Sequence, residues 1–208
     1  MKNNSLILIG AGGHAKSCID VIEQEGKYKI VGLVGLEKEL GLTVNGYDVT
    51  GTDSELSNLA KKSAFAIIAI GQIHSPNLRI KLLNKAIGAG FKIASSISPF
   101  AYISPYAEIG PGTIVMHGVV INSGVRIGSN CIINSRALIE HDVNISNNCH
   151  ISTGALINGN VSIGEGSFIG SGSVIKEGVS VGDNSIVKMS SSVLSDLPNI
   201  SKKNGETL

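Results

Sequence analysis

Between residues 97 and 193 the hydrophobic positions recur with a period of six, and every sixth residue is an Ile or a Val. The series opens with Ile97, Ile103 and Ile109 and closes with Val193. Four places after each member, as far as residue 187, stands a small or modest side chain such as Ala137. A fixed short period is typical of a solenoid, and a period of six predicts a parallel β-helix whose triangular coils each contain three segments.

The large and small side chains of this repeat are expected to interdigitate and to fill a narrow prism. Cys131 and Cys149 are eighteen residues apart, so they should lie one above the other inside it as unreactive thiols. Gly and Asn gather at the expected corners, as at Gly110, Gly128 and Gly164, where we attribute them to tolerance of a positive φ. A filled interior leaves no room for a ligand, so the chemistry must lie on the outside of the coils.

The first 95 residues have a different pattern, in which short apolar runs alternate with helical ones. We expect strands at 6–9, 30–34, 46–51, 64–70 and 91–94, and helices after residue 13, around 56–60 and at 78–87. Asp53 is expected to cap the second helix. This alternation predicts a small Rossmann-like parallel α/β domain over residues 1–95, followed by an all-β domain, the parallel β-helix, over residues 96–208.

A glycine loop lies between the first strand and the first helix. Gly10, Gly12 and Ala15 fit the G-x-G-x-x-A pattern, which places free backbone N–H groups where a phosphate binds. A dinucleotide would also need an acid at the end of the second strand, but Gly35 and Leu36 stand there, which disfavours NAD. The phosphate of another nucleotide and a tight turn without a ligand both stay open.

Charge and composition exclude several classes of function. The formal net charge of +1 gives no electrostatic case for binding nucleic acid. No run of apolar residues approaches the length of a membrane span, and nothing resembles a signal peptide. We therefore expect a cytoplasmic protein without a membrane or nucleic-acid partner.

His141 is the strongest candidate for catalysis, because it stands between Glu140 and Asp142. Either carboxylate could accept from one ring nitrogen and leave the other as a general base. His150 follows nine residues later, half a coil away, so it should face another side of the prism unless two chains bring the sites together. His117 and His141 should also lie on different faces, which disfavours a zinc site, and we expect no metal.

The order of these parts resembles a known family. The residues that carry the resemblance are Gly10-Ala11-Gly12-Gly13-His14, Ala69-Ile70-Gly71, Ile139-Glu140-His141-Asp142 and Cys149-His150-Ile151-Ser152. They are similar to those of the left-handed β-helix (hexapeptide-repeat) sugar acetyltransferases. The best comparison is with the enzymes that acetylate the 4-amino group of UDP-linked amino sugars, as in bacillosamine synthesis, and the sialic acid O-acetyltransferases share the layout.

The resemblance implies a left-handed winding, a homotrimer, and acetyl-CoA as the co-substrate. It makes His141 the general base and Asp142 its partner. The residues it places at acetyl-CoA are His150, Gly159, Ser171 and Gly172. The residues it places at the nucleotide sugar are Gly12, Gly13, His14 and Gly71.

Two departures from the family pattern concern the ligands. Gly35 and Leu36 replace an acidic pair that helps to hold the nucleotide. The stretch from Leu197 to Leu208 lacks the Gly-x-Pro-Ala-Lys/Arg ending that the family has near the CoA adenine. Lysines could make the contacts with the CoA phosphates instead. These lysines are Lys176, Lys188, Lys202 and Lys203.

The resulting expectation is N-acetylation of a UDP-linked 4-amino-4,6-dideoxy sugar. The alternatives are O-acetylation of sialic acid or another sugar, and a non-catalytic scaffold.

Overall fold

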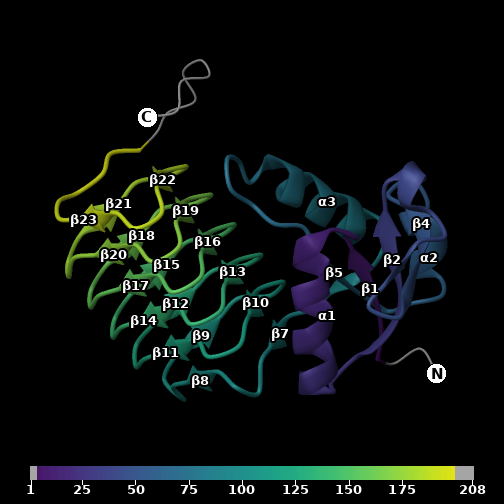
Figure 1. The fold of residues 1–208 in the computed structure, drawn as a ribbon, viewed down its shortest axis with the longest axis horizontal. Helices are drawn as coiled ribbons and strands as arrows, with labels where there is room; N and C mark the ends of the chain where they lie inside the picture. The colour runs from purple at the N-terminus through teal and green to yellow at the C-terminus, as the bar shows by residue number, and fades with distance from the viewer. Residues whose placement is uncertain (1–3, 200–208) are drawn as a thin grey trace. The chain divides into compact units, whose positions relative to one another are not determined.

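The computed structural model describes residues 4–199, and these form two compact units (Figure 1). The first unit contains the residues up to 71 together with 77–97. The second contains residues 98 onward together with the short segment 72–76. The chain therefore contributes residues to the second unit twice, and the segment that does so early lies between a strand and a helix of the first unit.

The first unit contains a six-stranded sheet with the strand order β3-β4-β2-β1-β5-β6. Its strands are β1 (Ser5–Ile9), β2 (Lys29–Gly35), β3 (Thr43–Val44), β4 (Tyr47–Thr52), β5 (Phe65–Ile68) and β6 (Lys92–Ile93), and β7 (Ser96–Ile97) closes the unit. Neighbouring strands of the sheet are parallel, apart from the antiparallel pair β3 and β4. The prediction of a parallel α/β fold is confirmed.

The helices of this unit are α1 (Gly13–Glu25), the 3₁₀ helix η1 (Glu37–Glu39), α2 (Leu56–Ala60) and α3 (Asn77–Gly88). Helix α1 ends at Gly26, whose φ of 67° is the left-handed conformation that glycine adopts without strain. Ile7 and Ile9 of β1 pack with Leu56 and Leu82 in one apolar core. The predicted cap of α2 is wrong: Glu55 precedes the helix, and Asp53 instead pairs with Lys85.

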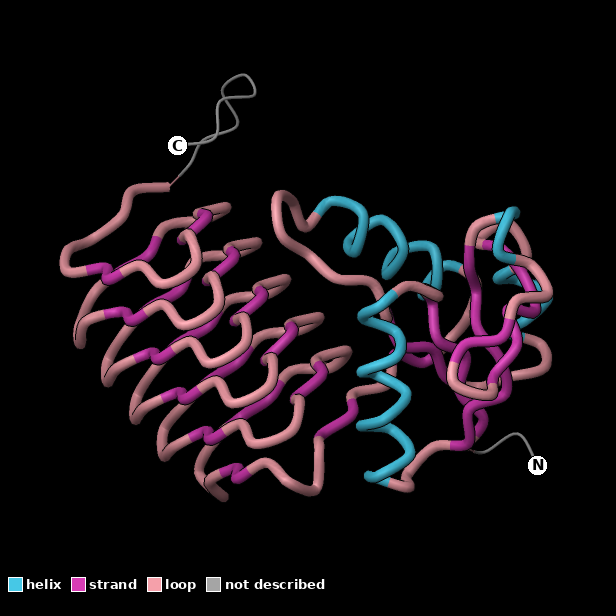
Figure 2. Tube along the Cα trace, in the orientation of Figure 1, coloured by secondary structure: helices cyan, strands magenta, loops and turns pink. Residues whose placement is uncertain are grey.

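The second unit is a parallel β-helix of two-residue strands joined by tight corners (Figure 2). One face stacks β10 (Ile114–Val115), β13 (Ile132–Ile133), β16 (His150–Ile151), β19 (Phe168–Ile169) and β22 (Ile186–Val187). The next stacks β8 (Tyr102–Ile103), β11 (Val120–Ile121), β14 (Leu138–Ile139), β17 (Leu156–Ile157), β20 (Val174–Ile175) and β23 (Ser192–Val193). The third stacks β9 (Glu108–Ile109), β12 (Arg126–Ile127), β15 (Asn144–Ile145), β18 (Ser162–Ile163) and β21 (Ser180–Val181).

The interior of the prism is the predicted one. Paired strands are offset by eighteen residues, so Ile139 lies directly opposite Ile157. Ile139, Ile157, Cys131 and Cys149 are all fully buried. The six-residue period therefore reports the inward side chains, and each group of eighteen residues forms one coil.

The corner glycines serve two purposes, of which only one was expected. Gly124, at the corner before Arg126, has a φ of 74° and does adopt the left-handed conformation. The glycines Gly110, Gly128 and Gly164 do not have a positive φ. A Cβ at Gly128 would lie 2.7 Å from the backbone nitrogen of Asn147 in the next coil. The explanation by positive φ is thus wrong for these three, which are small because the coils stack closely.

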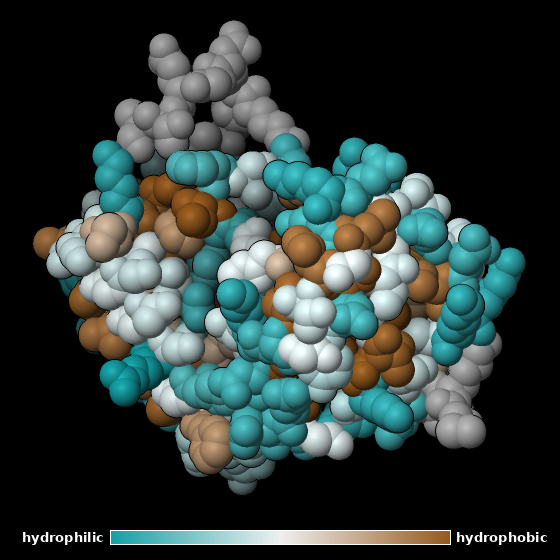
Figure 3. Space-filling view, turned by 45° about the vertical axis from the view of Figure 1, so that its right-hand side comes forward, coloured by the Kyte–Doolittle hydropathy of each residue, from teal (hydrophilic) through white to brown (hydrophobic). Residues whose placement is uncertain are grey.

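No helix within residues 4–199 is long and apolar enough to cross a membrane. On the face seen in Figure 3, apolar residues form separate patches among hydrophilic ones. Small separate apolar patches of this kind are normal on protein surfaces.

Candidate active site

His141 and Asp142 lie at the corner that follows β14. The Nδ1 atom of His141 is 3.0 Å from Oδ2 of Asp142, and about 60% of each side chain is exposed. The corner gives Asp142 a φ of 59°, which turns its side chain back along the chain toward the ring. A carboxylate at Nδ1 selects the tautomer in which Nε2 carries the lone pair, as a general base requires.

The second carboxylate beside His141 has a different partner. The amide of Asn122, one coil earlier, donates from Nδ2 to Oε2 of Glu140 over 3.0 Å. The sequence left both Glu140 and Asp142 as candidates to orient the ring. In the structure Asp142 contacts the ring, and Glu140 bonds to Asn122 instead.

Glycines of the neighbouring coils support both members of this pair. A Cβ at Gly159, one coil later, would lie 2.7 Å from Cε1 and from Nε2 of His141. A Cβ at Gly124, one coil earlier, would collide with Oδ1 of Asp142. Gly159, which the family resemblance places at acetyl-CoA, therefore also forms the surface on which the His141 ring lies.

His150 is on β16, a different face of the prism, and only 6% of it is exposed. Its Nδ1 is 2.6 Å from the carbonyl oxygen of Gln72, and its Nε2 is 3.3 Å from Nδ2 of Asn134. The side chain of Phe168 meets the ring edge-on, with the ring centres 5.2 Å apart. Because the carbonyl can only accept, His150 donates through Nδ1–H, and its Nε2 accepts from Asn134.

Gln72 is itself anchored to the β-helix. Its Nε2 donates to the carbonyl of Asn148 over 2.8 Å and to that of Gly166 over 3.3 Å, and the residue is 3% exposed. The segment 72–76 therefore fixes the position and the tautomer of His150.

Ser171 and Gly172 lie at another corner, between β19 and β20. The hydroxyls of Ser171 and Ser152 are 2.9 Å apart, and Gly172 has a φ of 66°. Within one chain this corner is separated from that of His141 by the strands β14, β17 and β20. The structure thus brings Gly159 to His141 but places Ser171 and Gly172 elsewhere.

The predicted nucleotide residues lie together in the first unit. Gly12 precedes α1, which begins at Gly13, and no side chain caps this end of the helix. A Cβ at Gly71 would lie 3.9 Å from that of His14. A Cβ at Gly12 or Gly13 would meet no atom within 4 Å, so the backbone here is open to a ligand.

A cleft of about 560 Å³ adjoins the glycine loop at the carboxyl ends of the strands, where open α/β sheets bind ligands. Its lining includes Gly10, Ala11, Gly12, Gly35, Leu36, Glu37, Glu39, Thr52, Asp53, Ser54 and Leu78.

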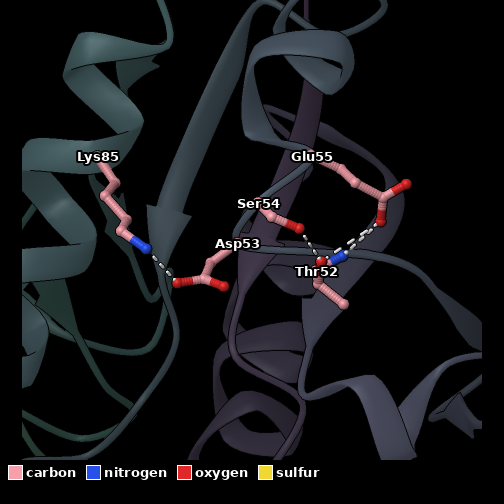
Figure 4. A network of polar contacts seen from close by, with 5 residues as sticks. All are labelled: Thr52, Asp53, Ser54, Glu55 and Lys85. Atoms are coloured by element: carbon pink, nitrogen blue, oxygen red, sulfur yellow. Dashed lines mark hydrogen bonds and ion pairs between the residues drawn. The ribbon is translucent and has the colours of Figure 1, made fainter.

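One wall of the cleft is held by polar contacts after β4 (Figure 4). The backbone N–H of Thr52 donates to Glu55 over 2.9 Å, and the Thr52 and Ser54 hydroxyls are 2.7 Å apart. Lys85 of α3 pairs with Asp53 at 2.5 Å, and this hydrogen bond is the main reason that the pKa of Asp53 lies below its usual value.

Comparison with known proteins agrees with this architecture. Residues 5–86 match the family model of the PglD N-terminal domain. Residues 100–141 match the bacterial transferase hexapeptide (six repeats), and residues 160–194 match the hexapeptide repeat of succinyl-transferase. No curated protein sequence matches the chain.

Several solved structures are similar over nearly the whole chain. PerB from Caulobacter crescentus, in complex with CoA and GDP-perosamine, is 34% identical over 95% of this chain and 92% of its own, with a TM-score of 0.88. This chain belongs to the left-handed β-helix sugar acetyltransferases.

The acetyltransferase domain of PglB from Neisseria gonorrhoeae, in complex with acetyl coenzyme A, is 33% identical over 94% of the present chain and 93% of its own, with a TM-score of 0.86. WeeI from Acinetobacter baumannii, 24% identical over 95% of both chains with a TM-score of 0.80, shares the fold. The predicted family, fold and enzyme class are confirmed.

The thiols of this acetyltransferase are inside the protein. Burial raises the pKa of Cys18 to about 12, and the contact with Cys131, followed by burial, raises the pKa of Cys149. Thiols with raised pKa values hold little nucleophilic thiolate at neutral pH. Among residues 4–199, no three His, Cys, Asp or Glu side chains converge as metal ligands would.

Three residues of the sites escaped sequence analysis. Gln72 and Asn134 give no signal, because each is a single polar residue in a short connecting segment. Glu39 lines the cleft that adjoins the glycine loop, and its signal was the glycine at residue 35 followed by two glutamates. Lys176 and Lys188 are exposed, whereas Lys202, Lys203 and most of the unusual ending lie outside the described residues.

Proposed function

We propose that this acetyltransferase moves the acetyl group of acetyl-CoA to the amino group of a nucleotide-linked 4-amino-4,6-dideoxy sugar. The observation that carries the proposal is the exposed His141–Asp142 pair, which lies against Gly159 at a corner of the β-helix. The glycine loop and its cleft in the first unit support a nucleotide sugar as the acceptor. Relatives that are similar over more than nine tenths of their chains, solved with CoA and GDP-perosamine or with acetyl coenzyme A, support the same pair of substrates.

The reaction is a direct transfer. The neutral sugar amine attacks the thioester carbonyl, and Nε2 of His141 takes the proton that the amine loses as the new bond forms. The Asp142 carboxylate stabilises the imidazolium that results. The tetrahedral intermediate then collapses, the acetamide forms, and CoA leaves as its thiolate, which takes the proton from the His141 imidazolium and returns the ring to its neutral form.

The oxyanion of the intermediate needs a hydrogen-bond donor. The geometry argues against His150, because its N–H is directed to Gln72 and its Nε2 accepts from Asn134. The amide of Asn134 has a second N–H that His150 does not use. We assign the donor role to this N–H or to a backbone N–H of the corners, with His150 orienting Asn134.

The site requires more than one chain in this proposal, since His141 and His150 belong to different faces. The face made by β8, β11, β14, β17 and β20 presents outward apolar side chains. These are Tyr102, Val120, Leu138, Leu156 and Val174. An apolar stripe beside the His141 corner supports a homotrimer in which neighbouring chains complete each site, with acetyl-CoA along the corner residues Ser171 and Gly172.

The deciding experiment is a panel of UDP- and GDP-linked amino sugars, together with sialic acid, incubated with acetyl-CoA and scored for released CoA and acetylated product. The proposal expects an N-acetylated nucleotide sugar. Acetylation of sialic acid would favour the O-acetyltransferase alternative, and no CoA release with any of the nucleotide-linked sugars would contradict the proposal.

A further inference from the structure

The cleft beside the glycine loop contains a carboxylate at the end of β2, although the residues there are Gly35 and Leu36. Oε2 of Glu39 accepts a hydrogen bond from the backbone N–H of Leu36 over 2.7 Å. A Cβ built on Gly35 would lie 2.8 Å from this same oxygen and 3.3 Å from the Cβ of Ala11. The Glu39 carboxylate therefore occupies the space in which a side chain at residue 35 would begin, beside the glycine loop.

This arrangement explains why residue 35 is a glycine. The helix η1 returns the chain toward β2, so Glu39 reaches the end of β2 from four residues further along. A larger residue at 35 would displace the carboxylate. In α/β folds that bind nucleotides through a glycine loop, an acid at the end of the second strand accepts hydrogen bonds from the ribose.

We propose that Glu39 binds the ribose of the sugar nucleotide by accepting hydrogen bonds from its 2′- and 3′-hydroxyls. The proposal rests on the proposed function, in that it takes a nucleotide sugar to be the acceptor. In the part of the chain that the structure describes, Oε1 of Glu39 makes no hydrogen bond, and Oε2 has a further lone pair. A vicinal diol offers two donors, which match these two acceptors.

The other acids of the cleft suit this role less well. Asp53 is paired with Lys85 at 2.5 Å, and the side chain of Glu37 is exposed. Leu36 and Leu78, which are 61% and 57% exposed, line the same cleft and offer apolar surface to the flat face of a base. Such contacts do not distinguish one base from another. Since UDP and GDP also share the ribose, Glu39 should contribute equally to the binding of both.

The test measures the affinity of the 208-residue chain for UDP and GDP and for their 2′,3′-dideoxy counterparts by calorimetry. A hydrogen bond to a charged group contributes about 1.5–3 kcal/mol, so wild type should bind the preferred ribonucleotide roughly 10- to 100-fold more tightly than its dideoxy form. Glu39→Ala should bind both forms equally, at the weaker level. Gly35→Ala should lose the same preference with the carboxylate still present, because the new methyl group displaces it.

Lys38→Ala is the control, since it removes an exposed charged side chain from the same 3₁₀ helix that does not line the cleft, and it should keep the wild-type preference. A Glu39→Ala protein that still prefers the ribonucleotide, or a Lys38→Ala protein that has lost the preference, would overturn the assignment while leaving the proposed function intact. A wild-type protein that binds neither diphosphate nor any nucleotide sugar would refute both.

Discussion

The imidazole of His141 lies against the backbone of Gly159, one coil further along the β-helix, so closely that a Cβ at residue 159 would be 2.7 Å from Nε2. Asp142 fixes the rotation of this ring through Nδ1, and Gly159 limits how far the ring can approach the next coil. Two different coils therefore determine where the Nε2 lone pair is directed.

Gly159→Ala tests this relationship. The added methyl group meets the end of a side chain that can swing away, so the fold should persist while the ring leaves its contact with Asp142. We expect kcat to fall by about 10-fold or more, with a melting temperature close to that of wild type. Gly88→Ala is the control, because a Cβ there meets no atom within 4 Å. Unchanged kcat in Gly159→Ala would show that the ring position does not matter.

His141→Ala should lower kcat by roughly 10²- to 10⁴-fold, the usual contribution of a general base, and change KM values by only a few-fold. Asp142→Asn should cost less, because it only orients and polarises the ring. Glu140→Gln, whose carboxylate is bound to Asn122, serves as the neighbouring control. An alanine variant with most of its kcat would rule out His141 as the base.

Gly13→Val should raise KM for the nucleotide sugar with little change in KM for acetyl-CoA. The substitution should not disturb the fold, since a Cβ at residue 13 meets no atom within 4 Å, but it covers backbone N–H groups that the phosphates approach. Steady-state kinetics with each substrate varied in turn measures the effect. Equal changes in both KM values, or none, would contradict the assignment.

His150→Ala should raise KM for acetyl-CoA and also destabilise the protein. The ring is buried, and its loss leaves the Gln72 carbonyl without its hydrogen bond, which costs about 1–3 kcal/mol. Thermal unfolding and acetyl-CoA kinetics separate the two effects. If stability falls while KM for acetyl-CoA stays constant, His150 has a structural role only.

Light scattering should give a mass three times that of one chain. Leu156→Glu places a charge on the apolar stripe and should reduce this mass together with activity. Ser162→Glu adds the same charge to the face made by β9, β12, β15, β18 and β21, and it should leave the trimer intact. A monomer at micromolar concentration with full activity would contradict the two-chain site.

The β-helix could be predicted from the sequence because each inward position meets the same environment in every coil, so composition repeats with geometry. The His141–Asp142 pair is local, and adjacency in sequence was sufficient to suggest it. Gly159 is one eighteen-residue period from His141, so the repeat places it in the next coil, but the close approach of its backbone to the ring is a tertiary detail. The anchoring of His150 by Gln72 and the approach of Glu39 to Gly35 are tertiary contacts between residues that share no periodic pattern. The contact of Gln72 depends on how a connecting segment returns, which no local signal records, and for Glu39 the only signal was the glycine at residue 35 followed by two glutamates.

The stacking of the second unit has a consequence for how this protein can change in length. Each coil closes after eighteen residues with its strands in register, as Leu138 opposite Leu156 shows, and each contacts only its neighbours. A deletion or insertion of one whole coil near the β23 end would leave the corner of His141 facing the same direction. A change of six residues between His141 and Gly159 would rotate everything beyond it by one face of the triangle and take the glycine away from the ring. The length of this β-helix can therefore change only by whole coils of eighteen residues if the corners on either side of the change are to keep their directions.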